Sequence, residues 1–257
     1  MRPIYDAHIH LDVYDNAEQK QIIKDMETYH VEGLITVSRH LLSAKRNLKL
    51  AQENKRIYPA FGFHPEQSLT SEQDIENTLY FLMKHQHEMV AVGEVGLPYY
   101  LRKQNNTIPI APYIEILEQF IKIAKRLHKP IVLHAVYEDA PLVCYLLEKH
   151  SITKAHFHWF KGDSKTVERL IQNGYFISFT PDVCYKEKIQ SLAKRYPISQ
   201  TMVETDGPWP FEGPFQDHKT HPRMIHQSVE KIAELKHMKL TDLYETIASN
   251  TRAFYKL

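Results

Sequence analysis

Eight short apolar segments, separated by longer amphipathic stretches, constrain the fold of this chain more than any other feature of its sequence. Short apolar runs are typical of buried strands, and amphipathic stretches between them are typical of helices that connect parallel strands. Eight such units predict an α/β fold, a closed (β/α)8 or TIM barrel, which needs about 250 residues; the chain has 257. The predicted strands are Ile4–Ala7, Gly33–Ser38, Ile57–Phe63, Val90–Glu94, Ile131–His134, Ala155–His158, Tyr175–Ser178 and Met202–Glu204.

Helical spacing of apolar residues is found between or after the predicted strands, in two segments and in a final pattern near the end of the chain. It predicts helices over Ile114–Leu127, Ile225–Leu235 and Thr241–Tyr255, the last with Thr241 as N-cap. The segments Leu101–Pro112 and Gly207–Pro214 are predicted to be loops. We see no repeat or linker that divides the chain, so residues 1–257 are expected to form one domain.

The charge balance and the cysteines exclude several classes of protein. With 32 Lys+Arg against 31 Asp+Glu, the net charge of +1 provides no broad cationic field for a long nucleic acid. Cys144 and Cys184 are far apart and form no CxxC pair, so we expect neither a disulfide framework nor a thiolate zinc site. No apolar run resembles a signal peptide or a membrane span, and a cytoplasmic protein with no membrane partner is expected.

Histidine and carboxylate side chains end many of the predicted strands. His8 and His10 lie two residues apart at the end of the first strand, so their side chains share a face. In a (β/α)8 barrel the carboxyl ends of all strands open onto one side, where catalytic residues gather. Imidazole and carboxylate groups together are suited to zinc and related divalent ions. The sequence therefore predicts a metal site at the strand ends, formed by His8, His10, Glu94, His134, His158 and Asp206.

Each of these residues alone also has an ordinary explanation. A lone histidine is commonly a hydrogen-bonded core or surface residue, and Glu94 or Asp206 could form an ion pair or cap a helix. Six such residues at successive strand ends are much harder to explain in that way. The set as a whole therefore favours metal binding over a structural role.

Five segments in the same order resemble the TatD family of metal-dependent deoxyribonucleases, which belongs to the amidohydrolase-like barrels. The segments are Asp6–Asp12 (DAHIHLD), Gly62–Pro65 (GFHP), Gly93–Leu97 (GEVGL), His158–Gly162 (HWFKG) and Glu204–Pro208 (ETDGP). The resemblance implies one or two divalent ions, with Zn, Mn, Mg, Ni and Fe all open. It implies His8, His10, Glu94, His134, His158 and Asp206 as metal ligands or catalytic residues. It also implies that His64 and Glu204 lie close to the metals or the substrate.

The chain departs from the family pattern around this set. Pro98 replaces an Asp, Ala135 and Val136 replace a Ser-Arg pair that follows the fifth strand, and Trp159 replaces a Cys. An arginine that would face a phosphate group is thereby missing. Hydrolysis as the reaction is therefore a safer expectation than DNA as the substrate. Further departures are Gly207–Pro210 (GPWP) and His221–Pro222.

The expected chemistry is hydrolysis by metal-activated water. Asp206 is the expected general base and proton shuttle, with Glu204 as a second carboxylate for that role. Glu94 is expected to bridge two ions, and His64 either orients a phosphate or serves only as a turn residue. Outside this set, Lys161 could bind phosphate, and Tyr99, Tyr100 and Trp209 could stack on a base or simply pack a loop.

Three functions are compatible with these expectations. The leading one is a phosphodiesterase or deoxyribonuclease that acts on a nucleic acid end or single strand. The alternative enzyme is an amidohydrolase or lactonase with a small carbonyl substrate. A non-catalytic binding module is disfavoured, because a structural role gives no reason to gather so many ionisable groups at one mouth.

Overall fold

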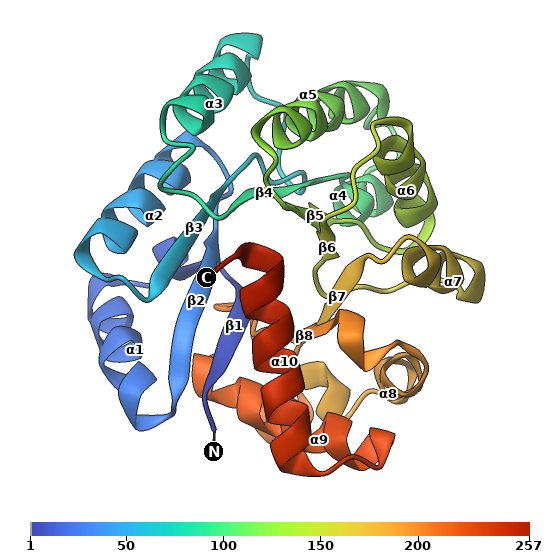
Figure 1. The fold of residues 1–257 in the computed structure, drawn as a ribbon. Coiled ribbons are helices and arrows are strands. Elements are labelled where there is room, and N and C mark those ends of the chain that lie inside the picture. The colour runs from blue at the N-terminus through green and yellow to red at the C-terminus, as the bar shows by residue number, and fades with distance from the viewer. Residues whose placement is uncertain (1) are drawn as a thin grey trace.

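The computed structural model describes residues 2–257, which form one parallel eight-stranded sheet with the strands in sequence order (Figure 1). Each strand pairs in parallel with the next. The N–H of Asp206, just after the last strand, donates to the carbonyl of His8 in the first at 2.9 Å, so the sheet closes into a barrel. The strands are β1 Ile4–Ile9, β2 Val31–Val37, β3 Ile57–Phe61, β4 Ala91–Gly96, β5 Ile131–His134, β6 Ala155–Phe157, β7 Phe176–Phe179 and β8 Thr201–Val203.

All eight predicted strands are confirmed, with shifts at their ends. β1 continues to Ile9 and β4 to Gly96, two residues past the predicted bounds. The polar residues at these two strand ends point into a buried cluster, so the apolar pattern stops before the strand does. Between Asp6 and Ile9 the pairing of β1 with β2 is also irregular, which period-2 alternation does not anticipate.

Helices cover the outside of the barrel and alternate with its strands (Figure 1). The predicted helices at 114–127 and 225–235 are confirmed as parts of α5 and α9. Within residues 2–257 we find no helix whose length and apolar character would let it span a membrane. The helices are α1 Asn16–Thr28, α2 Leu41–Glu53, α3 Glu72–Lys84, α4 Tyr99–Gln104, α5 Ala111–Leu127, α6 Ala140–Lys149, α7 Ser164–Gln172, α8 Glu187–Arg195, α9 Ile225–Lys236 and α10 Leu240–Tyr255.

The predicted loop Leu101–Pro112 is wrong at both ends. Its first residues belong to α4, whose N–H groups at Tyr100 and Leu101 are accepted by the side chain of Glu66, a partner far away in sequence. At the other end α5 begins at Ala111, because a proline is tolerated in the first turn of a helix.

Two smaller predictions also need correction or refinement. Thr241 is not the N-cap of α10: the helix begins one residue earlier, at Leu240, and the hydroxyl of Thr241 donates to Asp242 at 2.9 Å. The segment Gly207–Pro214 is a loop as far as Glu212, after which Gly213–Phe215 form a 3-10 turn.

The barrel encloses a core of small and branched side chains, separate from the larger apolar layer between strands and helices. α10 lies across one end of the barrel (Figure 1), where Phe254 and Tyr255 pack against this inner core. The aromatic end of α10 therefore closes the barrel on the side away from the carboxyl ends of the strands. The inner core comprises Ala7, Ile35, Val37, Ala60, Ala91, Val132 and Met202 with those two aromatic residues.

Candidate metal centre

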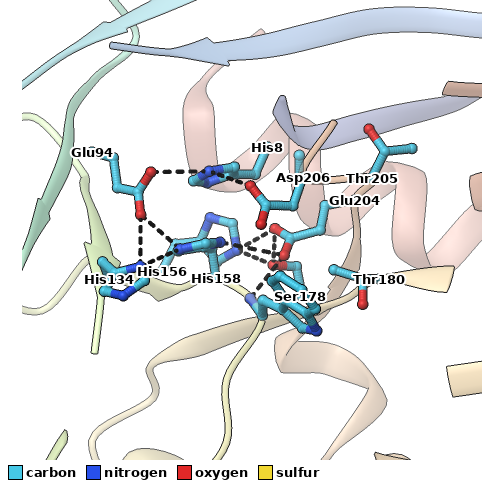
Figure 2. A network of polar contacts seen from close by, with 12 residues as sticks. His8, Glu94, His134, His156, His158, Ser178, Thr180, Glu204, Thr205 and Asp206 are labelled. Carbon is cyan, nitrogen blue, oxygen red and sulfur yellow. Dashed lines mark hydrogen bonds and ion pairs between the residues drawn. The ribbon is translucent and has the colours of Figure 1, made fainter. Parts of the chain in front are cut away.

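The carboxyl ends of five strands bring histidine and carboxylate side chains together in one buried cluster (Figure 2). β1 supplies His8, with His10 directly after its last residue, while β4 supplies Glu94 and β5 supplies His134. His158 follows directly after β6, and Asp206 lies in the segment that follows β8. None of these side chains belongs to a residue more than 8% exposed. The structure thus gathers all six predicted metal-site residues, namely His8, His10, Glu94, His134, His158 and Asp206.

The Glu94 carboxylate lies at the centre of the cluster, with a different group of side chains on each oxygen. Its Oε2 is 3.3 Å from Nε2 of His8 and 3.2 Å from Nε2 of His10. The same two nitrogens lie 3.4 and 3.5 Å from Oδ1 of Asp206. One oxygen of Glu94 therefore shares two imidazole groups with Asp206.

The other oxygen of Glu94 faces three further histidines. Its Oε1 is 2.7 Å from Nε2 of His158, 3.1 Å from Nδ1 of His134 and 3.4 Å from Nε2 of His64. A carboxylate whose two oxygens each face imidazole nitrogens has the arrangement expected of a group that bridges two cations. Among residues 2–257, ligand atoms within 4.8 Å of one another occur in three sets: His8, His10 and Glu94; His64, Glu94 and His134; and His8, His158 and Glu204.

The polar atoms that face one another in the cluster test whether a cation fits there. Nε2 of His8, Oε2 of Glu94 and Oδ1 of Asp206 are buried and have no hydrogen-bond partner. Buried polar atoms are rarely left unsatisfied, and their cost is about 1–3 kcal/mol each. A divalent cation would satisfy all three at once, and the mixed nitrogen and oxygen donors suit such an ion.

Two glycines allow the strand ends to approach closely around Glu94. A Cβ at Gly62 would lie 2.5 Å from the carbonyl oxygen of Glu94, and one at Gly96 would lie 1.9 Å from that of His134. No larger residue fits either position without moving the backbone. The glycines of the GFHP and GEVGL segments therefore have a packing role beside the site.

Burial and mutual contacts set the charges of these groups. Burial lowers the pKa of His8 well below its usual value, which leaves the imidazole neutral, as a metal ligand must be. Burial raises the pKa of Asp206 to about 7 despite the opposing effect of His158 and His10. Burial also disfavours ionisation of Glu94, but His158, His64 and His8 outweigh it and hold the pKa of Glu94 well below its usual value.

Glu204 lies next to His158 in a buried polar network (Figure 2). Its Oε2 accepts the hydroxyl of Ser178, and its Oε1 accepts the N–H of Trp159 at 2.7 Å and lies 3.6 Å from Nδ1 of His158. Ser178 in turn contacts His156, at 2.5 Å. Both oxygens of Glu204 are thus already used as acceptors, which favours a positioning role over proton transfer.

Asp6, the first residue of the DAHIHLD segment, fastens β1 to the end of β8. Its Oδ1 accepts the N–H groups of His8, at 3.2 Å, and Thr205, at 3.0 Å, and its Oδ2 accepts the Thr205 hydroxyl at 2.5 Å. Asp206 follows at φ 48°, a left-handed conformation that Asp tolerates better than most residues. This pairing holds the two ligand-bearing strand ends together.

His64 also faces the cluster. Its Nδ1 accepts the N–H of Glu66 at 3.1 Å, which places the proton of a neutral imidazole on Nε2, toward Glu94. Burial lowers the pKa of His64. The residue is therefore more than a turn residue before Pro65.

A pocket with a volume of about 370 Å³ opens onto the cluster. Arg39 lines it, and within residues 2–257 no carboxylate forms an ion pair with the guanidinium, whose buried Nε has no hydrogen-bond partner. Arg39 was not predicted from the sequence, although it directly follows the second predicted strand and so had the same positional signal as the other site residues. The remaining lining is His64, Glu66, Gln67, Tyr100, Leu101, Gln104, His134, His158, Trp159, Asp206 and Trp209.

The residues that depart from the family pattern have different locations. Trp159 lines the pocket, and the centroid of its ring lies 3.7 Å from Nζ of Lys161. Lys161 lines a separate cavity with Tyr137 and Lys186. Ala135 and Val136 are buried rather than part of the pocket lining. Pro98 precedes α4, the helix that brings Tyr100 to the pocket, whereas neighbouring Tyr99 is not part of the lining.

A (β/α)8 barrel with a buried histidine and carboxylate cluster at its carboxyl strand ends defines the class of metal-dependent barrel hydrolases. A family model described as "TatD related DNase" matches residues 5–256. The chain belongs to this family and is a metal-dependent hydrolase.

Individual relatives and solved structures are similar over nearly the whole chain. An uncharacterized metal-dependent hydrolase of Haemophilus influenzae is 38% identical, over 99% of this chain and 100% of that protein. Human deoxyribonuclease TATDN3 is 26% identical, over 99% of this chain and 95% of that protein. The crystal structure of the TatD homologue YJJV from Escherichia coli shares the fold with a TM-score of 0.87 at 22% identity, covering 99% of this chain and 98% of that one.

Proposed function

We propose that this protein is a divalent-metal-dependent phosphodiesterase that hydrolyses DNA or RNA at an end or in a single strand. The observation that carries the proposal is the Glu94 carboxylate, whose two oxygens face two different groups of histidines. Membership of a family described as DNases, and a relative named a deoxyribonuclease, support nucleic acid as the substrate.

The two faces of Glu94 are suited to two ions. His8, His10 and Asp206 would hold one ion with Oε2, and His134 and His158 would hold the other with Oε1. Zinc, manganese, iron and nickel match this donor set better than magnesium, which prefers oxygen ligands and water. A divalent ion there supplies Lewis acidity, which acidifies water and polarises the phosphoryl group.

The side chains of the chain itself bind the substrate and move the protons. Asp206 borders both the cluster and the pocket, so its carboxylate is placed to take the proton of the attacking water and return it to the leaving oxygen. Arg39 offers free guanidinium donors to a phosphate that enters the pocket, in place of the arginine missing after β5. His64 presents an N–H toward the same space, and Glu204 orients His158.

The size of the pocket limits what can enter. A volume of about 370 Å³ is near the lower end of small-ligand sites, which span roughly 300–1,000 Å³. Such a space suits one terminal or unpaired nucleotide better than an intact duplex. Tyr100 and Trp209, 36% and 40% exposed at its edge, are available to stack on a base.

A screen of metals against substrates tests this proposal. Purified protein is stripped with a chelator, reloaded with one divalent ion at a time, and assayed on labelled single-stranded DNA, RNA, double-stranded DNA and simple esters and amides. We expect cleavage of single strands or ends that requires metal and is lost in the double variant His8→Ala, His10→Ala. Full activity in chelator overturns the mechanism, and turnover of esters or amides alone would instead support an amidohydrolase or lactonase.

A further inference from the structure

The Glu66 carboxylate connects the cluster to the start of α4. Its Oε1 accepts the N–H of Tyr100 at 2.8 Å and lies 3.1 Å from Nε2 of His134. Its Oε2 accepts the N–H of Leu101 at 2.7 Å. With only 14% of its side chain exposed, Glu66 is held in one orientation by two backbone donors and one imidazole.

The contact with Glu66 determines which nitrogen of His134 is available to the cluster. An ionised carboxylate only accepts hydrogen bonds, so Nε2 of His134 must carry the proton that faces Glu66. Nδ1 faces a second carboxylate, Glu94, but Oε1 of Glu94 has a nearer donor in Nε2 of His158, at 2.7 Å, so the lone pair of a neutral His134 lies on Nδ1. That nitrogen is the one directed at the cluster, 3.1 Å from Oε1 of Glu94 and 3.2 Å from Nε2 of His158.

We propose that Glu66 is a positioning residue of the metal site, which fixes the tautomer and ring orientation of His134 so that Nδ1 can bind an ion. Carboxylates that accept the second N–H of a ligating histidine perform this role in metalloproteins in general. The inference rests on the metal site proposed above and not on nucleic acid as the substrate. Because Glu66 follows the His64-Pro65 pair and is not at a strand end, nothing in the strand pattern marks it.

Three variants separate this role from simple capping of α4. Glu66→Ala removes the carboxylate, and Glu66→Gln keeps its shape while replacing one acceptor with a donor. The matched control is Glu118→Gln, because Oε1 of Glu118 also contacts a histidine nitrogen, Nε2 of His150 at 2.8 Å, between α5 and α6 outside the site. Circular dichroism and thermal unfolding establish that each variant is folded.

Two measurements do not depend on enzymatic activity. Long-range nitrogen–proton NMR spectra of the metal-free protein at alkaline pH report the tautomer of His134, assigned with a His134→Gln variant. Competition with a chromophoric chelator gives the affinity for zinc and manganese. We expect a proton on Nε2 in the wild type, loss of that preference in Glu66→Ala, and a ~10–100-fold weaker affinity for one equivalent of metal. Glu66→Gln should show smaller changes in both the His134 tautomer and the metal affinity. Glu118→Gln should change neither.

Each other outcome overturns the proposal. Wild-type metal affinity in a folded Glu66→Ala, or an unchanged His134 tautomer, assigns Glu66 to capping α4 alone. If Glu66→Ala does not fold, wild-type affinity and tautomer in Glu66→Gln assign Glu66 to capping in the same way. A wild-type protein that binds no metal overturns the proposed metal site as well, so failure of the two proposals is distinguishable.

Discussion

Five histidine side chains lie within 3.4 Å of the Glu94 carboxylate, and Asp206 shares two of them. Their positions at strand ends could be predicted because β periodicity and barrel geometry place such residues on one side. Glu66 could not be predicted, since its importance comes from hydrogen bonds to α4 and His134. Position at a strand end therefore indicates the residues of the cluster, although Arg39 has the same signal and was not predicted, and it does not indicate Glu66.

The first prediction at the residue scale concerns Asp206. Replacing it with Asn preserves shape but removes the negative charge and most of the basicity, so we expect kcat to fall by ~10²–10⁴. Kinetics should be paired with metal analysis, using His134→Ala as the variant whose primary defect is weaker metal retention. Near-normal turnover by Asp206→Asn with its metal retained would transfer the proton role to His64 or Glu204.

The second prediction at the residue scale concerns Arg39, which lines the pocket without an ion-pair partner among the described residues. A hydrogen bond to a charged group contributes about 1.5–3 kcal/mol, so Arg39→Met should raise KM for an oligonucleotide by ~10-fold or more. Arg126→Met, a change on the exposed face of α5, is the control and should leave KM unchanged. An equal KM for both variants would remove Arg39 from substrate binding.

Among the elements, α4 shows where local sequence is insufficient. Its first N–H groups are satisfied by a carboxylate 34 and 35 residues earlier in the chain, a contact that no local pattern encodes. The eight strands and the long helices α5 and α9, in contrast, have periodic apolar faces that are visible in sequence. The elements with the clearest periodic burial were predicted with their ranges, whereas α4, which depends on a distant acceptor, was predicted to be part of a loop.

A pH-dependent contact between elements lies at His226 in α9. The residue is 2% exposed; its Nδ1 accepts the hydroxyl of Tyr244 in α10 at 2.7 Å, and its Nε2 donates to the carbonyl of Tyr29 at 2.5 Å. Burial lowers the pKa of His226, so the folded state resists protonation and the unfolded state does not. Its contribution to the free energy of unfolding is present above the unfolded pKa of about 6.5 and is lost as pH falls below it.

The matching prediction uses His226→Gln, which can keep one donor and one acceptor but does not titrate. Denaturant unfolding in chelator between about pH 5 and 8, around the unfolded pKa, should show wild-type stability falling below that pKa by up to ~1.4 kcal/mol per pH unit more than the variant. Identical slopes for the two proteins would show that His226 does not contribute to the pH dependence.

On the scale of the whole molecule, the cluster takes its members from β1, β4 and β5 and from the segments after β6 and β8. These strands lie around the entire barrel, so the unfolded chain cannot present the same set of ligands. An ion bound only by the folded state, at a free concentration of ~100 times Kd, stabilises that state by ~2.7 kcal/mol. For a domain of this size such a gain corresponds to an increase in Tm of ~5–10 °C.

Removing metal should therefore lower the unfolding temperature of the whole barrel, and manganese or zinc should restore it. Differential scanning calorimetry with and without chelator measures the shift, and elemental analysis of the same samples verifies the metal content. The double variant His8→Ala, His10→Ala, which removes both imidazoles from one face of Glu94, should respond much less to chelator than the wild type. If the wild type loses its metal with no change in Tm, then the ion does not link the strand ends, and the barrel is stabilised by its apolar core alone.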